Sequence, residues 1–382
     1  MFKKLLVIGM ALTFIACDGE PTRPPGDGAQ QNEASVPGPD GGLVDVALGD
    51  NGLPPNNDKG VGFDQQIKAD SKVPVDPNKD TDGDGLPDGF EALSPNLDPT
   101  KKDTDGDKIP DGDEDEDQDG LTAAVEWAAY KATPTASLAK PSPRHRDLLI
   151  EADHQTGMLP SAKALSEMVK AYAAINLSNL DGKKGINLMI FVDEKNLPVT
   201  AMSESLTARL DYLGAHGPKV LKGAFINKMV HVIFASTRPG SASRGGDTVA
   251  SNKASAEKAG VLIYPANLAK LFPSCLSPTS PKVTAEEVVI STFVHEVGHT
   301  LQLGHDTAAG GGVNPYNIMS TDLKSCDLLK KRTRGEGNTN ATLGATPGNA
   351  PRFSTAAAKL IKMKNKISVE AKEFEKSGGY EM

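Results

Sequence analysis

Residues 295–305 read HEVGHTLQLGH, and this stretch decides both the fold and the chemistry expected of the chain. Residues four apart lie on one face of a helix, so His295 and His299 can present their imidazoles to one ion. His305 follows six residues after His299, so three of the chain's seven histidines fall within this stretch. Core packing does not explain such a density of imidazoles. The spacing predicts a zinc (Zn2+) centre of three histidines, with a fourth position open to water.

Glu296 lies beside this predicted centre without being needed as a ligand. A carboxylate there can take a proton from a metal-activated water that attacks a peptide carbonyl, and can then deliver it to the leaving amine. We therefore expect a zinc-dependent metalloendopeptidase that acts on protein or peptide substrates, with Glu296 as general base. The alternative is a non-enzymatic, calcium-dependent surface adhesion or binding protein on the same scaffold, although a structural metal site has no need of this carboxylate.

The extended motif resembles that of the metzincin clan of zinc metallopeptidases, and within the clan it is suggestive of the pappalysin-like branch. Metzincins place a methionine in a tight turn beneath the metal. Met319, in the segment YNIMS at residues 316–320, matches that Met-turn. Thr321 stands where some metzincins have a metal-facing tyrosine, which leaves Tyr316 as the candidate for that role.

One residue departs from the metzincin pattern. Metzincins usually have glycine three residues after the second histidine, where the helix ends and the chain turns towards the third ligand, and this chain has Gln302 there. Two outcomes are open. Either Gln302 adopts a positive φ, at a cost on the order of 1 kcal/mol, or the turn is displaced by a residue or two.

The resemblance implies the fold of residues 140–382. It is a metzincin-like α/β (α+β) domain with a mostly parallel sheet, a backing helix, the active-site helix and a C-terminal helix. The apolar pattern agrees with this, because it predicts strands at residues 147–153, 186–192, 229–235 and 260–264. It predicts helices at residues 161–175, at 284–303 and from 355 to about 375.

The loop after a Met-turn commonly shapes specificity in metzincins, so residues 322–352 are expected to do so here. Four basic residues in this loop predict tolerance of acidic substrate side chains; they are Lys330, Lys331, Arg332 and Arg334. The other histidines receive non-catalytic interpretations. His231 lies in an apolar strand and is expected to pack there, and three histidines near element ends are expected to be solvated: His145, His154 and His216.

Residues 79–130 are expected to be calcium-binding acidic repeats. Between Asp80 and Gly120 there are 16 acidic residues and three lysines, a local net charge of −13 in a chain whose total is −9. Residues 80–91 read DTDGDGLPDGFE, with acidic residues at positions 1, 3, 5, 9 and 12 and glycine at position 6. This is the spacing of an EF-hand-type calcium loop. A merely solvated acidic linker would not need this alternation.

The pattern recurs twice, with Lys108 in place of the glycine in the second copy and Ala123 at position 9 of the third. The repeated sequence pattern resembles the thrombospondin type 3 repeat. The ligands expected for Ca2+ are Asp80, Asp82, Asp84, Asp88 and Glu91 in the first repeat, Asp103, Asp105, Asp107, Asp111 and Glu114 in the second, and Asp115, Asp117, Asp119 and Glu126 in the third.

The N-terminus has the pattern of an export signal. Residues 1–16 combine two lysines with a short apolar run, and the following cysteine gives the sequence FIAC, which resembles the lipobox of bacterial lipoproteins. The resemblance implies a lipid on Cys17, and the alternative is an ordinary signal peptide. Residues 17–78, rich in Gly, Pro, Asp and Asn, are expected to be a disordered tether. The expected product is an exported monomer, lipid-anchored to a bacterial membrane on its surface or periplasmic side.

The remaining cysteines and the charge distribution bear on disulfide bonding and on the expected partners. If Cys17 carries lipid, Cys275 and Cys326 are left, and in an exported chain they are expected to form a disulfide worth about 2–4 kcal/mol. Two buried free thiols are the alternative. No basic stripe is visible in the sequence, so nucleic acid is not an expected partner.

Overall fold

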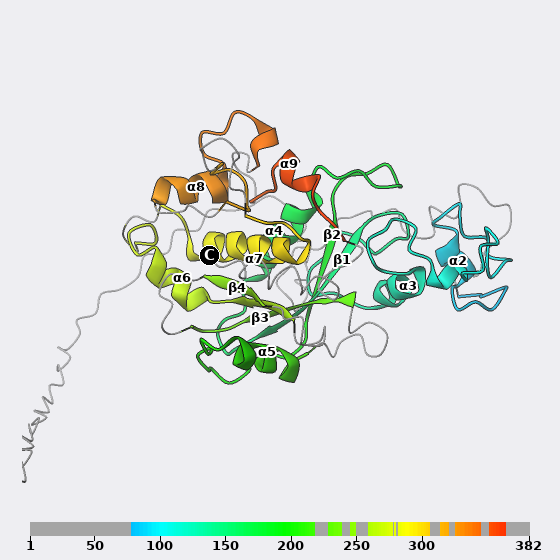
Figure 1. The fold of residues 1–382 in the computed structure, drawn as a ribbon, viewed down its shortest axis with the longest axis horizontal. Coiled ribbons are helices and arrows are strands. Elements are labelled where there is room, and N and C mark those ends of the chain that lie inside the picture. Colours follow the sequence, from blue (N-terminus) through cyan, green and yellow to red (C-terminus); the bar gives the residue numbers. More distant parts are fainter. Residues whose placement is uncertain are drawn as a thin grey trace, which may run out of the picture. The chain divides into compact units, whose positions relative to one another are not determined.

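The computed structural model describes residues 78–217, 228–238, 245–249, 259–277, 279, 282–305, 314–320, 325–344 and 351–363. The predicted signal peptide, Cys17 and all but the last residue of the predicted tether lie outside the described residues. The described part contains one five-stranded sheet and eight α-helices (Figure 1). The expectation of a mixed α/β fold with a mostly parallel sheet is confirmed.

The strands lie in the order β2-β1-β3-β5-β4. Four of them run parallel and match the predicted strands closely: β1 (Asp147–His154), β2 (Asn187–Val192), β3 (Val230–Phe234) and β5 (Gly260–Ile263). The fifth, β4 (Gly246–Val249), pairs antiparallel with β5 at the edge of the sheet and was not predicted.

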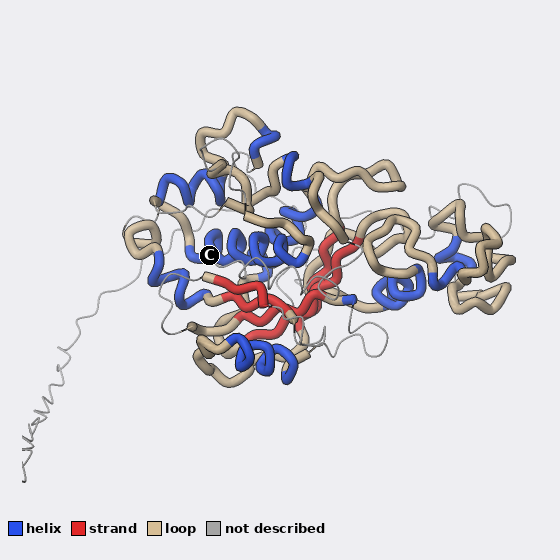
Figure 2. The backbone as a smooth tube through the Cα atoms, viewed as in Figure 1, coloured by secondary structure: helices blue, strands red, loops and turns tan. Residues whose placement is uncertain are grey.

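Helices cover both faces of this sheet. The first face carries α4 (Ala162–Ala173) and α7 (Ala285–Thr300), and its core includes alternate β1 residues such as Ile150. The opposite face packs against α3 (Ala123–Lys131) through Leu149, and against α5 (Leu206–Ala215) through Ile233. Figures 1 and 2 show α7 and α5 on opposite sides of the strands.

Helix α7 is the central element of the first face. It begins at a capping box in which the Thr284 hydroxyl accepts from the amide of Glu287 and the Glu287 carboxylate accepts from the amide of Thr284. Every residue from Val288 to Thr300 is buried. The phenol of Tyr172, on α4, donates a 3.2 Å hydrogen bond to the carbonyl of Val294. The helix that carries the histidines is therefore held rigidly from several sides.

Three further helices contribute to the same core as α7. They are α6 (Pro265–Leu271), α8 (Cys326–Arg334) and the short α9 (Thr355–Ala358). Cys326, at the start of α8, is joined to Cys275 by a disulfide, in agreement with the expected pairing. Across the described residues, no helix combines the length and apolarity needed to span a membrane.

The predicted helix at residues 355–375 is wrong for residues 359–363, which follow its first turn. It starts at Thr355 as expected, but α9 ends at Ala358. The amide of Lys362 donates to the carbonyl of Leu301, and Met363 is buried in the core of the first face. These tertiary contacts outweigh the local helical preference. Residues after 363 lie outside the described part.

The acidic repeats have a small core of their own. Helix α2 (Asp88–Glu91) and a 3-10 helix (Asp111–Asp113) follow the first two loops. Phe90 packs against Trp127 and Tyr130 of α3, with ring centroids 5.5 and 5.9 Å away. Since α3 also packs on the sheet through Val125, it belongs to both cores and connects the repeats to the α/β domain.

Candidate metal centres

The structure brings the three predicted zinc ligands together. His295 and His299 project from one face of α7, and His305 follows the end of the helix. The Nε2 atoms of His295 and His299 are 3.1 Å apart. The ring centroid of His305 lies 5.2 Å from that of His295 and 4.8 Å from that of His299. Ligand atoms of all three lie within 4.8 Å of one another.

The outward contacts of two imidazoles fix which nitrogen faces the centre. Nδ1 of His295 lies 2.7 Å from the carbonyl oxygen of Ile318, and Nδ1 of His299 lies 2.7 Å from that of Leu303. A carbonyl only accepts, so each Nδ1 carries a proton and each Nε2 presents a lone pair to the other. Two acceptor nitrogens at 3.1 Å repel unless a cation lies between them. A backbone partner on the second nitrogen is also the usual arrangement of metal-binding histidines. The residues therefore fit zinc.

Burial keeps these imidazoles in the form that binds metal. It lowers the pKa of His295 well below the ordinary value of histidine, with smaller contributions from nearby His299 and Arg332. Burial lowers the pKa of His299 to about 3 and that of His305 to about 4. All three are thus neutral at neutral pH, as metal ligation requires.

Gln302 has a φ of 67°, which confirms the first of the two outcomes considered for the turn. The helix ends at Thr300, and the amide of Leu303 turns back to the carbonyl of Gly298. The turn is therefore at residue 302 itself and is not displaced, with a glutamine held in the left-handed region at a cost on the order of 1 kcal/mol.

Met319 lies directly under the helix that carries the histidines. It is buried, and a Cβ added to Gly298 would lie 2.7 Å from its sulfur. The amide of Ile318 donates to the carbonyl of Arg352, and the amide of Ser320 donates to the carbonyl of Asn317. Residues 317–320 thus form a tight turn that supports the site and also supplies the carbonyl bound by His295.

Glu296 is fully buried beside the histidines, and one of its oxygens is fixed. The Thr248 hydroxyl lies 2.8 Å from both the carbonyl oxygen and Oε2 of Glu296. Within the described residues, Oε1 has no hydrogen-bond partner. Burial raises the pKa of this carboxyl to about 8, while the bond from Thr248 opposes that rise. The free oxygen is the one available to a water or a substrate.

Strand β4, which the sequence interpretation missed, supplies this support. A Cβ on Gly246 would lie 2.8 Å from Cγ of Glu296, so only glycine leaves room for the carboxylate. Asp247 receives two hydrogen bonds of 2.8 Å from Arg238 and one of 2.7 Å from the Tyr264 hydroxyl. The paired glycines at residues 245–246 are the signal in the sequence that could have marked a close approach of backbone here.

Arg332 does not contribute to a pocket for acidic side chains, and that expectation is wrong for this residue. It is completely buried, where it donates to Ser291 on α7 and to the carbonyl of Ser320. Arg334 pairs with Glu287, and Lys330 lies 3.3 Å from Glu336. These side chains join α8 to its neighbours instead. The Tyr316 hydroxyl is directed to the carbonyl of Glu336 at 3.4 Å.

The three acidic loops have the same backbone conformation. Positions 4 and 6 have positive φ in every copy, although they are occupied by glycine in some copies and by Lys108 or Gln118 in others. The amide of position 9 donates to the carbonyl preceding position 1 in each copy, including Ala123, which donates to Glu114. The first-position carboxylates, Asp80, Asp103 and Asp115, each accept from the amide of position 6.

The carboxylates of the first loop converge. Asp80, Asp82 and Asp84 offer oxygens within 4.8 Å of one another, and so do Asp84, Glu91 and Asp111 of the second repeat. Glu91 is fully buried, yet neither of its oxygens has a hydrogen-bond partner among the described residues. Burial, and then Asp84 and Asp82, raise its pKa to about 8.

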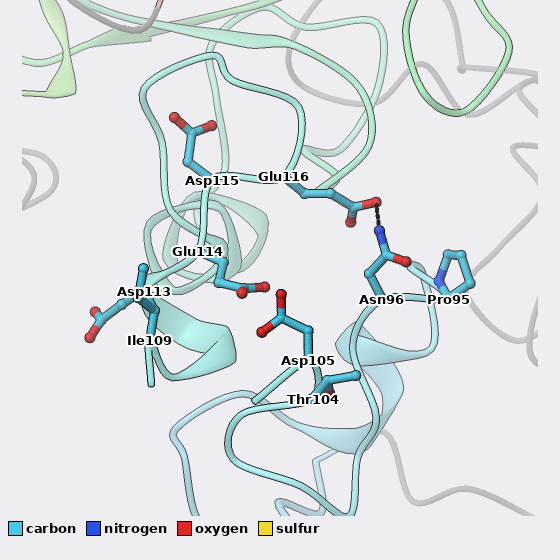
Figure 3. Close-up of a pocket in the computed structure, with 9 residues that line it drawn as sticks. All are labelled: Pro95, Asn96, Thr104, Asp105, Ile109, Asp113, Glu114, Asp115 and Glu116. Atoms are coloured by element: carbon cyan, nitrogen blue, oxygen red, sulfur yellow. Dashed lines mark hydrogen bonds between the residues drawn. The ribbon is translucent and has the colours of Figure 1, made fainter. Parts of the chain in front are cut away.

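The position-9 aspartates also accept hydrogen bonds within their own loops. Both oxygens of Asp88 accept from Thr81, and both oxygens of Asp111 accept from Thr104. Asp105 and Glu114 of the second repeat line a pocket, and Figure 3 shows their carboxylates pointing towards each other. Burial raises the pKa of Glu114 to about 7, and Asp105 is the next cause.

The third loop is the most buried of the three. Asp117, Asp119 and Glu126 are at most 3% exposed, and Asp147, the first residue of β1, lies against them. Burial and the neighbouring carboxylates raise the pKa of Asp117 to about 9 and that of Glu126 well above its ordinary value. Oδ2 of Asp117 and Oε1 of Glu126 have no hydrogen-bond partner within the described residues. Unpartnered carboxylate oxygens of this kind are suitable ligands for a cation.

The other histidines differ in part from expectation. His231 is buried in β3, as predicted. His154 was expected to be solvated but is only 5% exposed, because its ring closes against the backbone and lies 3.1 Å from the carbonyl of Gln155. His145 and His216 are half-buried beside Asp181 and Glu194.

No protein-family model matches the chain, and the search of curated proteins finds no match either.

Proposed function

We propose that the chain is a zinc-dependent endopeptidase that hydrolyses peptide bonds, with His295, His299 and His305 as zinc ligands and Glu296 as general base. The observation that carries the proposal is the 3.1 Å approach of two Nε2 acceptors, beside a carboxylate with one oxygen free. The Met-turn beneath the site and the left-handed Gln302 support the metzincin resemblance.

Zinc at this position supplies a Lewis acid that polarises the scissile carbonyl and makes water a nucleophile at neutral pH. The chain itself provides proton transfer. Thr248 holds Oε2 of Glu296, so Oε1 is the oxygen that takes a proton from the attacking water and passes it to the leaving amine. Because the carboxyl is buried, water is largely excluded from competing for that proton.

The edge strand gives a place for the substrate. Strand β4 is the last strand of the described sheet, and Thr248 and Gly246 on it contact Glu296. An extended peptide can add to a sheet edge through main-chain hydrogen bonds. We expect the substrate to lie along β4, where its backbone would be close to the catalytic carboxylate.

The test compares casein or gelatin hydrolysis by the mature chain, in zinc and calcium, with that of Glu296→Ala. Loss of the general base should lower kcat by about 10²–10⁴. Glu167→Ala, on the outer surface of α4, is the matched control and should retain activity. Equal activity in wild type and Glu296→Ala contradicts the proposal. A folded, zinc-loaded wild type without turnover would favour the calcium-dependent binding protein.

We further propose that residues 79–130 bind Ca2+ and that the mature chain is exported and lipid-anchored through Cys17. Buried carboxylate oxygens without partners, above all those of Glu91, support the calcium sites. Equilibrium dialysis with 45Ca2+ tests them, and Glu91→Gln should lose one bound ion relative to wild type. Mass spectrometry of the N-terminal peptide tests the lipid.

A further inference from the structure

A second buried cluster of metal-binding side chains lies on the face of the sheet turned away from α7. Glu151 and Asp153 are two residues apart on β1, so both point to this face, while Ala152 between them points to the core under α7. His231 lies opposite Glu151 in the register of β1 and β3. All three side chains are at most 2% exposed.

The three side chains converge on a single point. Nε2 of His231 is 3.2 Å from Oε2 of Glu151 and 3.2 Å from Oδ2 of Asp153. Among the described residues, no hydrogen bond of normal geometry reaches either oxygen of Glu151. In the described part of the chain, His231 is the only basic side chain paired with these two carboxylates. Two buried carboxylates sharing one imidazole leave the cluster short of positive charge, which is costly in an apolar interior.

Two further potential ligands, Glu194 and His216, lie beside Asp153. The amide of Glu194 donates a 2.8 Å hydrogen bond to Oδ1 of Asp153, and Nδ1 of His216 lies 2.6 Å from Oε2 of Glu194. Asp153, Glu194 and His216 offer ligand atoms within 4.8 Å of one another. Glu194 and His216 are half-buried, so they give an ion a route from solvent to the buried carboxylates.

We propose that Glu151, Asp153 and His231 form a second transition-metal site, closed on its outer side by Glu194 and His216. Tetrahedral zinc, with bonds of 2.0–2.2 Å, sets its ligand atoms roughly 3.3–3.6 Å apart, close to the 3.2 Å distances in the cluster. Mixed imidazole and carboxylate donors suit zinc and its neighbours in the first transition row. Calcium is disfavoured, because it takes six to eight oxygen ligands.

The charge environment supports the same assignment. Glu151 and Asp153 are both fully buried and project from the same face of β1, so two negative charges lie close together there. The competitor for the site is therefore a proton on Glu151. A divalent cation compensates both carboxylates at once, whereas a proton compensates one. The ion would also cross-link β1, β3 and the segments around Glu194 and His216, so its role is structural.

The experiment separates this site from the three-histidine centre. The mature chain carrying His295→Ala and His299→Ala is titrated with Co2+ in excess Ca2+, which occupies the acidic repeats. We expect about one Co2+ per chain with the intense visible absorption of a tetrahedral site. Adding Glu151→Gln or His231→Gln should weaken this binding by at least about tenfold. His145→Gln, which removes the histidine of another carboxylate pair, is the matched control and should bind normally.

Each outcome decides the question. Binding of less than a tenth of an equivalent by the folded double variant would overturn the second site and indicate a protonated Glu151 instead. Unchanged Co2+ affinity in both Glu151→Gln and His231→Gln would also overturn it, because the bound ion would then lie elsewhere. Failure of the proposed peptidase activity has no bearing on this result, since the background variant already lacks two ligands of the three-histidine centre.

Discussion

The backbone amide of Asp147 donates a 2.5 Å hydrogen bond to Oδ2 of Asp119. Asp119 belongs to the third acidic loop, and Asp147 is the first residue of β1, so this bond joins the repeats to the central sheet. The Asp147 carboxylate also receives hydrogen bonds from the amide of Ser142 and from Asn187 on β2. The order of the third loop and the order of the sheet are therefore coupled.

Calcium removal should lower the stability of the whole described domain. A ligand present at 100 times its Kd stabilises the folded state by about 2.7 kcal/mol, which for a domain of this size shifts Tm by roughly 5–10 °C. Differential scanning calorimetry with and without Ca2+, at constant zinc, measures the shift. Asp117→Asn should reduce it, and Asp98→Asn, a half-buried acidic control outside the predicted ligands, should not. Two independent transitions, of which only one responds to calcium, would contradict the coupling.

The calcium-free protein should become less stable as pH rises from about 4.5 to 8. The pKa of Glu91 is raised to about 8, mainly by burial, whereas an unfolded glutamate titrates near 4.3. In this window the folded state keeps a proton that the unfolded state has released, so stability falls with pH until the folded pKa is passed. Urea unfolding at a series of pH values measures the slope. Glu91→Gln should make the slope shallower, and saturating Ca2+ should reduce it further; a rising slope without calcium would refute the argument.

Gly298→Ala should destabilise the protein and weaken zinc binding, although alanine is the better helix former. The added methyl would lie 2.7 Å from the sulfur of Met319. Overpacking costs typically about 1–3 kcal/mol, against a gain of about 1 kcal/mol in helix propensity. Chemical unfolding and competition with a zinc chelator measure the two effects. Met319→Leu is the control, with an expected cost below about 1.5 kcal/mol. A more stable Gly298→Ala with unchanged zinc affinity would contradict the packing.

Gln302→Gly should stabilise the protein by about 1 kcal/mol, because glycine adopts the left-handed conformation without strain. The buried amide of Gln302 also lacks hydrogen-bond partners among the described residues, so its loss costs little. Thermal unfolding of the zinc-loaded protein measures the change. Gln302→Ala removes the amide but keeps the strain, and the difference between the two variants isolates the backbone contribution. Equal stabilities of the two would show that φ at this position is not strained.

The sequence predicts those elements whose local pattern and tertiary environment agree. The parallel strands are rich in apolar residues because helices cover both faces of the sheet, and the helix with the histidines has a capping box at its start. Strand β4 is not predicted because its residues fit tertiary contacts and do not follow a strand pattern. Gly246 leaves room for Glu296, and Asp247 accepts hydrogen bonds from Arg238. The predicted helix does not continue past Ala358 because the amide of Lys362 donates to the carbonyl of Leu301, a residue remote in sequence.

Some residues of the candidate site can likewise be predicted from the sequence, and others cannot. The spacing of His295, Glu296 and His299 is a property of one helix, so sequence alone predicts that they lie together. Thr248 lies 48 residues from Glu296 and has no motif that announces the contact. Arg332 shows the opposite error, since a basic residue in a loop predicts exposure, yet its hydrogen bonds to Ser291 and Ser320 require burial.

The disulfide between Cys275 and Cys326 encloses a stretch of chain that contains the three histidines, Glu296 and Met319. In a reducing compartment this loop is open, and the entropy of closing a 51-residue separation must be overcome by contacts alone. The fully assembled centre is then less populated in the compartment where the chain is made than in an oxidising one. On the proposed function, reduction of this disulfide would lower the hydrolytic activity of the chain, and oxidation would restore it.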